Sequence, residues 1–273
     1  MDFTNVKINI GLNVLQKRED GFHDIETLFY PIELKDILEC VPGEESQDEK
    51  LFFNTTGGGL DNDEAENLCI TAWNMMDELH TLPKTKMHLH KLIPVGAGLG
   101  GGSSDAAYTI EVLNRLYKLN MSEKEKMELA AQIGSDCTFF IYNKPALAMG
   151  RGEVLKTVKT NLSNHYLVLV HPGIHISTSL AYSEITPGKP EIRLEDAIEK
   201  PISEWKDTIH NDFEQTVFTK YPKIGKIKEE LYNYGALYAS MTGSGSAVYG
   251  IFNRHVKLKN RFPSFFVYEC LIK

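Results

Sequence analysis

The residues whose types and spacing most clearly indicate chemistry lie between Pro94 and Ala107, in the stretch PVGAGLGGGSSDAA. Glycines let a backbone approach a ligand closely and adopt positive φ. The N–H groups of a first helical turn have no intrahelical partner, and the helix dipole adds partial positive charge there. A glycine-rich run that opens a helix therefore predicts a site for an anionic group, above all a phosphate.

The flanking segments supply the elements that such a site needs. Residues alternate in type from Met87 to Ile93, which predicts a strand before the glycines. Apolar residues recur at helical spacing from Ala106 to Tyr117, which predicts a helix after them, and Ser103 or Ser104 is the expected N-cap. The order is therefore strand, glycine-rich loop and helix.

Three other kinds of segment can carry a glycine-rich run: a Walker A loop, a dinucleotide-binding loop and a flexible linker. This run lacks the Gly-Lys-Ser/Thr ending of a Walker A loop. Gly96, Gly98 and Gly101 fit G-x-G-x-x-G, but an acidic residue at a strand end about 20 residues on, as in a dinucleotide site, is missing. A flexible linker is disfavoured by the strand and helix on either side.

Composition excludes some partners. The 273 residues carry a formal net charge of −8, which argues against a nucleic-acid binder held by a basic face. The N-terminus has no long apolar segment and no apolar run approaches 18 residues, so we expect neither secretion nor a membrane partner. Cys40, Cys69, Cys137 and Cys270 are scattered without a C-x-x-C, which indicates reduced thiols in a cytoplasmic protein.

A strand with one buried and one polar face is predicted from Val6 to Val14. Lys7 and Asn9 stand together on its polar face. A solvated strand lysine is one interpretation of Lys7 and a functional cation is the other. Phe22 and His23 follow a polar turn, where they either recognise a ring or only pack the turn.

A carboxylate, Asp136, follows a helix that a capping box opens at Ser122 and that Gly134 closes. The apolar run after Asp136 predicts a strand, so this residue should lie at a helix-to-strand corner. It either bonds nearby backbone N–H groups or acts on a ligand. His88 and His90 have the spacing of two metal ligands, but no third ligand accompanies them at convincing spacing.

Strands and helices alternate in the second half of the chain. Tyr166–Val170 and 265–271 read as strands, and 211–220 and 222–234 read as helices. The stretch 176–179, with Ser177, Thr178 and Ser179, can cap a helix that carries Tyr182. The thinly patterned stretch 156–165 is the expected domain boundary, which gives domains 1–160 and 161–273. The predicted class is α+β, with two α/β domains.

Three stretches in this order, Val6–Leu12, Pro94–Ala107 and Met241–Val248, resemble the motifs of the GHMP kinase superfamily. The resemblance implies an S5-like N-terminal domain that binds ATP and a ferredoxin-like C-terminal domain, with substrate between them. The narrower resemblance is to the branch that phosphorylates a hydroxyl of a cytidine diphosphate conjugate of a methylated tetritol, in the non-mevalonate route to isoprenoid precursors. It is carried by Lys7–Asn9, Asp20–His23, Gly98–Ser104 and Gly134–Asp136.

The resemblance also implies roles. Asp136 would be the general base that accepts the alcohol proton, and Lys7, within a few ångströms of it, would keep that carboxylate ionised. ATP, with Mg²⁺, would bind Pro94, Gly96, Gly98, Leu99, Gly100, Gly101, Gly102, Ser103, Ser104, Lys91 and Asn67, and the Ser104 hydroxyl would also hold the metal ion. Substrate would bind Asn9, Phe22, His23, Thr178, Tyr182, Gly243 and Ser244, with the cytosine between Phe22 and Tyr182 and bonded to His23.

This chain departs from the family pattern at Phe22, where a tyrosine is usual, at Gly11, and in the sequence Gly-Ser-Asp-Cys-Thr around Asp136. None of these changes removes a catalytic group. The alternatives are a GHMP kinase for another alcohol, such as mevalonate or homoserine, and a non-catalytic nucleotide-binding regulator. We expect a monomer or a homodimer.

Overall fold

In the computed structural model, which describes residues 1–58, 67–160 and 162–273, the chain forms two compact units. The first unit consists of Met1–Val6, Leu34–Val95 and Gly100–Asn143, and the second of Lys7–Glu33, Gly96–Leu99 and Lys144–Lys273. Strands β1 (Asp2–Lys17) and β2 (His23–Pro42) contribute residues to both.

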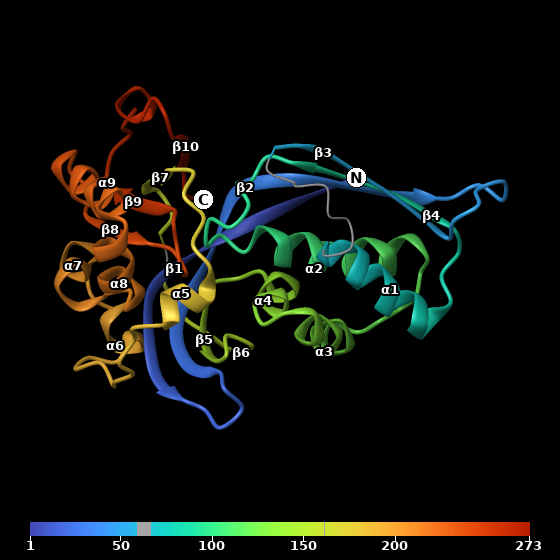
Figure 1. Ribbon diagram of the computed structural model, residues 1–273, viewed down its shortest axis with the longest axis horizontal. Helices are drawn as coiled ribbons and strands as arrows, with labels where there is room; N and C mark the ends of the chain where they lie inside the picture. The colour runs from blue at the N-terminus through green and yellow to red at the C-terminus, as the bar shows by residue number, and fades with distance from the viewer. Residues whose placement is uncertain (59–66, 161) are drawn as a thin grey trace. The chain divides into compact units, whose positions relative to one another are not determined.

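The first unit is a sheet with helices along one face (Figure 1). β3 (Leu51–Gly57) runs parallel to β4 (Thr85–Lys91), and β4 pairs antiparallel with the second half of β2. The helices are α1 (Leu68–His80), α2 (Gly101–Leu116), α3 (Glu123–Ile133) and α4 (Cys137–Tyr142). Their apolar faces and the buried side of the strands make one core, which includes Leu38, Trp73, Met76, Leu89 and Ile110.

Several local predictions are confirmed in this unit. Ser122 and Glu125 form the capping box of α3, and Gly134 is its C-cap. The strand predicted after Asp136 is wrong, because these residues form the helix α4. A short apolar run fits a buried strand and a buried helix turn equally well, so periodicity could not decide.

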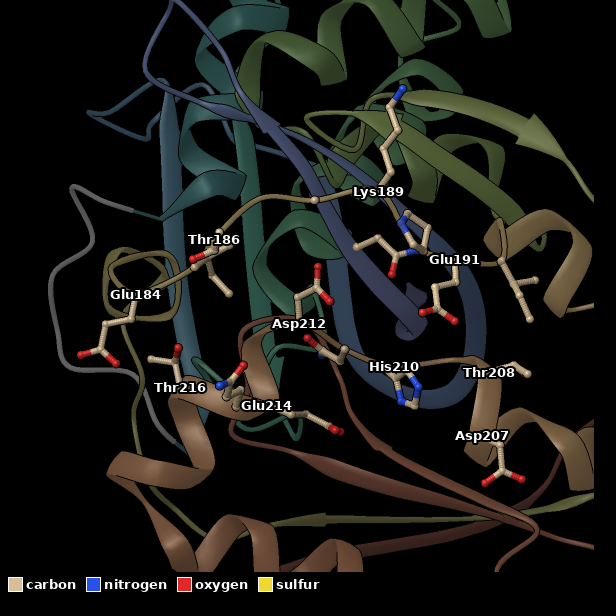
Figure 2. A pocket seen from close by; sticks show the side chains of 17 residues that line it. Glu184, Thr186, Lys189, Glu191, Asp207, Thr208, His210, Asp212, Glu214 and Thr216 are labelled. Carbon is tan, nitrogen blue, oxygen red and sulfur yellow. The ribbon is translucent and has the colours of Figure 1, made fainter.

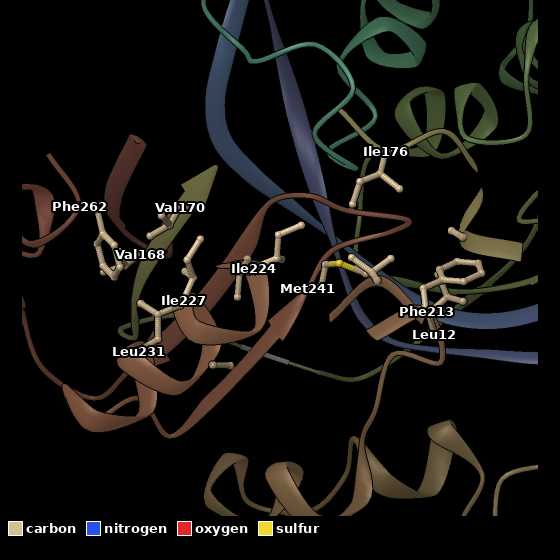
Figure 3. Packing of buried hydrophobic residues seen from close by; sticks show 14 of the residues in the cluster. Leu12, Val168, Val170, Ile176, Phe213, Ile224, Ile227, Leu231, Met241 and Phe262 are labelled. Atoms are coloured by element: carbon tan, nitrogen blue, oxygen red, sulfur yellow. The ribbon is translucent and has the colours of Figure 1, made fainter. Parts of the chain in front are cut away.

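The second unit contains an antiparallel sheet in the order β10 (Phe266–Leu271), β7 (Tyr166–His171), β9 (Val248–Phe252) and β8 (Tyr238–Met241). Helices α8 (Phe213–Lys220) and α9 (Pro222–Asn233) pack on this sheet (Figure 1). Figure 3 shows their contact, in which Ile224, Ile227 and Leu231 of α9 meet Val168 and Val170 of β7. As predicted, Pro222 stands in the first turn of α9.

Shorter elements complete the second unit. β5 (Ala146–Gly150) and β6 (Val154–Thr157) form a hairpin, and β5 pairs with the first part of β2. The short helices are α5 (Thr178–Tyr182), α6 (Leu194–Ala197) and α7 (Trp205–Thr208). Within the stretch that was expected to cap α5, Ser177 is the N-cap and accepts a hydrogen bond from Leu180 N.

Two predictions concern the whole chain, namely the reduced cysteines and the division into two domains. All four cysteines are free thiols, as predicted. The division at residues 160 and 161 stays a prediction, and residue 161 lies outside the described residues. In the described ranges, no helix is both long and apolar enough to cross a membrane.

Candidate active site

The face of β1 that carries Lys7 and Asn9 is buried in the second unit. Lys7 is 3% exposed and Asn9 is 2% exposed, although the alternation of residue types predicted a polar, solvated face. The interpretation of Lys7 as a solvated strand lysine is therefore wrong. Burial of an ammonium group is costly unless polar partners surround it, so the residues around Lys7 must supply such partners.

That environment fixes the position of the ammonium group. Lys7 Nζ donates a hydrogen bond to Asn9 Oδ1 at 2.5 Å and lies 4.7 Å from the centre of the Phe29 ring. Asn9 is held in turn, because its Nδ2 donates to Thr27 Oγ1 at 3.0 Å. A cation held this way is preorganised to interact with negative charge that develops during a reaction.

Backbone hydrogen bonds hold the middle of the glycine loop, Gly96–Leu99, within the same unit. Lys7 N donates to Leu99 O at 3.1 Å, so the loop segment lies beside the strand that carries the buried lysine. Ala247 N donates to Ala97 O at 3.1 Å, which joins the loop to the third motif. The glycine segment belongs to the second of the three motifs found in the sequence, and it thus contacts both of the other motifs directly.

Gly98 is the closest point of this contact. Its φ is +77°, and a Cβ atom there would lie 2.1 Å from Thr242 O, so no other residue fits without a backbone shift. Thr242 Oγ1 donates to Gly98 O at 3.0 Å and accepts from Asn9 N at 3.0 Å. The neighbouring turn residue Gly243 is buried and Ser244 is half-buried, and the substrate roles implied for both stay predictions.

Asn211 is a buried residue of this region that the sequence analysis did not single out. Its Nδ2 donates to Met241 O and to Gly243 O, both at 2.9 Å, and its Oδ1 accepts from Phe213 N at 3.0 Å. The only local signal was an asparagine next to a predicted helix start, which is typical of a cap. Its link to the turn of the third motif, about thirty residues away, has no local signature.

The other end of the loop opens α2 in the first unit. The helix begins at Gly101, and Gly100 is the N-cap, with φ +71° and no side-chain hydrogen bond, so the predicted cap at Ser103 or Ser104 is wrong. The Ser104 hydroxyl donates instead to Asn5 O at 2.5 Å. A helix start without a side-chain cap keeps its first-turn N–H groups available to an anionic ligand.

Ser104 does not fit the role of a magnesium ligand in this arrangement. The residue is 0% exposed, and its hydroxyl hydrogen is engaged by Asn5 O. Among the described residues, no group of three or more His, Cys, Asp or Glu side chains could hold a metal ion. We therefore assign no protein ligand to Mg²⁺, and the Ser104 assignment stays a prediction that the geometry does not support.

Lys91, the last residue of β4, lies buried at the foot of the loop. Its Nζ donates to Asp105 Oδ2 at 2.7 Å and to Asp36 Oδ2. Asp36 Oδ1 accepts from Ile93 N at 2.8 Å, and Thr4 Oγ1 donates to Asp105 Oδ1 at 2.5 Å. These bonds tie both ends of the loop, at Ile93 and in the first turns of α2, to one ionic cluster. Lys91 was predicted to bind nucleotide, which stays untested, and the two aspartates were not singled out.

The charges in this cluster do not balance, since one ammonium serves two carboxylates. Burial lowers the pKa of Lys91, but the charges of Asp105 and Asp36 more than offset this, and the net pKa is raised. Burial raises the pKa of Asp105 to about 6, against the lowering effect of Lys91. Asp36 also accepts two backbone N–H bonds, from Leu92 N and Ile93 N.

The remaining predicted residues of the first unit lie at helix starts. Asp136 is the half-buried N-cap residue of α4, with no side-chain cap hydrogen bond. Asn67 is the N-cap of α1, where its Oδ1 accepts from Cys69 N at 2.9 Å. Lys7 belongs to the second unit, so its pairing with Asp136 stays a prediction.

Aromatic rings gather in the second unit around residues predicted to recognise a base. The rings of His23 and Tyr182 are stacked, with centroids 4.6 Å apart and an angle of 17°. Phe213 meets Tyr182 edge-on at 4.7 Å. Phe22 is 54% exposed, and Thr178, at the start of α5, is exposed too. The structure thus brings His23 and Tyr182 together, and their roles toward cytosine stay predictions.

A cavity of about 770 Å³ lies elsewhere in the second unit (Figure 2). The titratable side chains around it are mostly carboxylates, namely Glu184, Glu191, Asp207, Asp212 and Glu214, with Lys189 and His210. Burial raises the pKa of Asp212, whose Oδ2 accepts from Val14 N at 2.7 Å. Its described lining includes no residue predicted to bind nucleotide or substrate, and its acidic character is unsuited to an anionic nucleotide.

Comparison with known proteins identifies the family. Family models described as GHMP kinases N terminal domain and GHMP kinases C terminal match residues 67–144 and 194–266. A 4-diphosphocytidyl-2-C-methyl-D-erythritol kinase of Parabacteroides distasonis is 45% identical over 269 residues, which cover 98% of this chain and 97% of that protein.

Solved structures agree with this. A crystal structure of 4-(cytidine 5'-diphospho)-2C-methyl-D-erythritol kinase matches with a TM-score of 0.82 and 29% identity, over 98% of this chain and 97% of that one. The mevalonate kinase of Methanococcus jannaschii shares the fold, with a TM-score of 0.69 and 16% identity, over 100% of this chain and 98% of that one. The predicted α+β kinase fold is confirmed, and the dinucleotide-site and linker interpretations of the loop are wrong. The chain belongs to the GHMP kinase family.

Proposed function

We propose that this kinase transfers the γ-phosphoryl group of ATP to the 2-hydroxyl of 4-diphosphocytidyl-2-C-methyl-D-erythritol, a step of the non-mevalonate route to isoprenoid precursors. The observation that carries the proposal is the 45% identity to a kinase of that name over 98% of this chain. Mevalonate kinase is similar at only 16% identity, which supports the shared fold and no particular alcohol.

The chain offers the groups that this transfer needs. The glycine loop would cradle the β- and γ-phosphates with backbone N–H groups at the uncapped start of α2. Asp136 would accept the proton of the attacking hydroxyl, a role that contributes about 10²–10⁴-fold in rate. Lys7, held by Asn9 and Phe29, would offset negative charge on the reacting oxygens.

The kinase would bind the nucleotide end of the substrate as well as its alcohol end. His23 and Tyr182, which lie stacked, and the exposed Phe22 offer the flat surfaces that a cytosine ring uses. Mg²⁺ is the counter-ion that we expect with ATP, where it neutralises phosphate charge. The proposal includes a cytoplasmic location, which the free thiols suit, and a monomer or homodimer.

The test is an ATP-dependent phosphorylation assay of the purified chain with 4-diphosphocytidyl-methylerythritol, mevalonate and homoserine as separate acceptors. We expect turnover of the first compound alone. The Asp136→Asn variant should lose at least about a hundredfold in kcat while it still binds ATP. Glu123→Gln is the matched control, because it removes a carboxylate at another helix start of the first unit. Activity on mevalonate or homoserine, with none on the cytidine compound, would refute the proposal.

A further inference from the structure

Phe22 is held outward by a stiff turn between β1 and β2. Arg18 N donates to Phe22 O at 2.8 Å, and Phe22 N donates to Asp20 Oδ1 at 3.1 Å. The Arg18 guanidinium also pairs with Asp20 at 2.9 Å and with Asp24 at 2.8 Å. Its hydrogen bond to Asp20 lowers the pKa of that carboxyl. More than half of the Phe22 surface is nevertheless open to a ligand.

Arg151 lies over the Phe22 ring, with its guanidinium carbon 5.0 Å from the ring centre. It stands at the tip of the β5–β6 hairpin, whose first strand pairs with β2 from Ile25 to Phe29. The Glu153 carboxylate accepts from Arg151 N at 2.7 Å and so fixes the backbone of this tip. The pairing of β5 with β2 and the turn before β2 together bring the Arg151 guanidinium to the edge of the unit where Phe22 lies.

The guanidinium keeps unused donors. In the part of the chain that the structure describes, its ion-pair partner is Glu153, with Arg151 Nε 3.8 Å from Glu153 Oε1, beyond hydrogen-bond distance. The neighbouring carboxylates Asp20 and Asp24 are bonded to Arg18 instead. A guanidinium that stacks on a ring can still present several N–H groups in its plane, in the geometry that suits two phosphate oxygens.

We infer that Arg151 is a specificity-determining residue that binds the diphosphate of a nucleoside diphosphate group on the alcohol substrate, beside the aromatic surface of Phe22. This deepens the proposed function and rests on it. The positive charge and planar donors of Arg151 recognise the anionic diphosphate, and the ring of Phe22 keeps the guanidinium in place.

The experiment measures equilibrium binding of CDP and of cytidine, by calorimetry, to the full chain and to Arg151→Gln, Arg151→Lys and Arg193→Gln variants. Arg193 is a matched control, since it is an exposed arginine of the same unit paired with Asp196. The wild-type chain should bind CDP about tenfold or more tighter than cytidine, because charge-assisted bonds to phosphate are lost with cytidine. Arg151→Gln should remove most of that difference, Arg151→Lys should keep part of it, and Arg193→Gln should keep all of it.

Kinetics add a readout that a role in folding alone would not give. In Arg151→Gln the KM for the cytidine substrate should rise about tenfold, while the KM for ATP and the kcat stay near wild-type values. An unchanged CDP affinity in Arg151→Gln would overturn the inference. An equal loss of affinity for CDP and for cytidine would also overturn it, because Arg151 would then only hold the Phe22 ring in place and make no contact with the diphosphate. If the wild-type chain binds CDP through Arg151 but phosphorylates no cytidine compound, the proposed function fails and the binding site stands.

Discussion

The side-chain amide of Asn211 donates a hydrogen bond to Gly243 O at 2.9 Å, and the same nitrogen donates to Met241 O at 2.9 Å. These two bonds hold the turn from Met241 to Gly243 in place. Gly98 of the glycine loop rests on that turn, so closely that a Cβ atom would lie 2.1 Å from Thr242 O. Asn211 therefore holds the turn on which the glycine loop packs, without being part of the loop.

Asn211→Ala should weaken both stability and nucleotide binding. It leaves two buried carbonyl groups without this donor, so the free energy of unfolding should fall by about 2–3 kcal/mol. The loosened turn should raise the KM for ATP more than the KM for the alcohol. Urea denaturation and steady-state kinetics measure the two effects. Asp212→Asn is the control, because an amide oxygen can still accept the bond from Val14 N. An Asn211→Ala chain as stable as the wild type would contradict this prediction.

Gly98→Ala and Gly102→Ala should separate the folding role of the loop from its ligand role. Alanine at Gly98 meets Thr242 O and positive φ, so we expect a loss of at least about 2 kcal/mol in the free energy of unfolding. Gly102 is an exposed helical position with Leu68 Cδ1 3.8 Å from an added Cβ, and alanine there should fold normally.

If phosphates approach the backbone at the start of α2, Gly102→Ala should still raise the KM for ATP about tenfold or more. Thermal unfolding measures the first variant, and ATP titration measures the second. A Gly102→Ala chain that binds ATP as the wild type does would show that the phosphates lie elsewhere. A Gly98→Ala chain of unchanged stability would show that the loop can shift away from Thr242.

Local patterns predicted the elements around the loop well, because each has a local cause. The strand before the loop, the helix after it and the capping box at Ser122 depend on neighbours a few residues apart. The N-cap of α2 was misplaced, because Ser104 uses its hydroxyl on Asn5, a residue about a hundred positions away. The apolar run after Asp136 was assigned to a strand, because its length fits either element.

Burial of polar residues is what the sequence could not reveal. Lys7 and Asn9 alternate with apolar residues, and such a pattern usually has one face in water, whereas here the partners from the glycine loop and the third motif cover it. Asp36 lies inside β2, with nothing nearby in the sequence to show that Lys91 would meet it. These contacts depend on tertiary pairing, which no spacing in the sequence encodes.

Lys7→Met should lower kcat with little effect on folding. Methionine is apolar and of similar length, so it can pack on Phe29 at this buried position, where an ammonium is costly to bury. Loss of a preorganised cation near the transferred group should cost about 10²–10³-fold in kcat. Steady-state kinetics and thermal unfolding test this, with Lys124→Met, an 85% exposed lysine, as control. A kcat within a few-fold of the wild type would remove Lys7 from the mechanism.

Asp105→Asn should change how stability depends on pH. Asp105 has a pKa of about 6 in the folded chain, raised by burial from an ordinary value of 3.8. Between these pH values the folded chain holds a proton that the unfolded chain has released. Raising the pH through this window therefore lowers the free energy of unfolding, by up to about 3 kcal/mol, and above pH 6 the cost is fully present.

The asparagine of the Asp105→Asn variant does not titrate, and its oxygen can still accept a hydrogen bond from Lys91 or Thr4. The free energy of unfolding of the variant should therefore not fall between pH 4 and 6 as that of the wild type does. Urea denaturation across that range, for the wild type and for Asp105→Asn, measures the difference. Asp77→Asn is a control, because Asp77 pairs with the exposed Lys50 on the same unit. Equal slopes in the wild type and Asp105→Asn would mean that Asp105 stays ionised beside Lys91 throughout, and that the cluster carries a net negative charge in the folded chain at every pH tested.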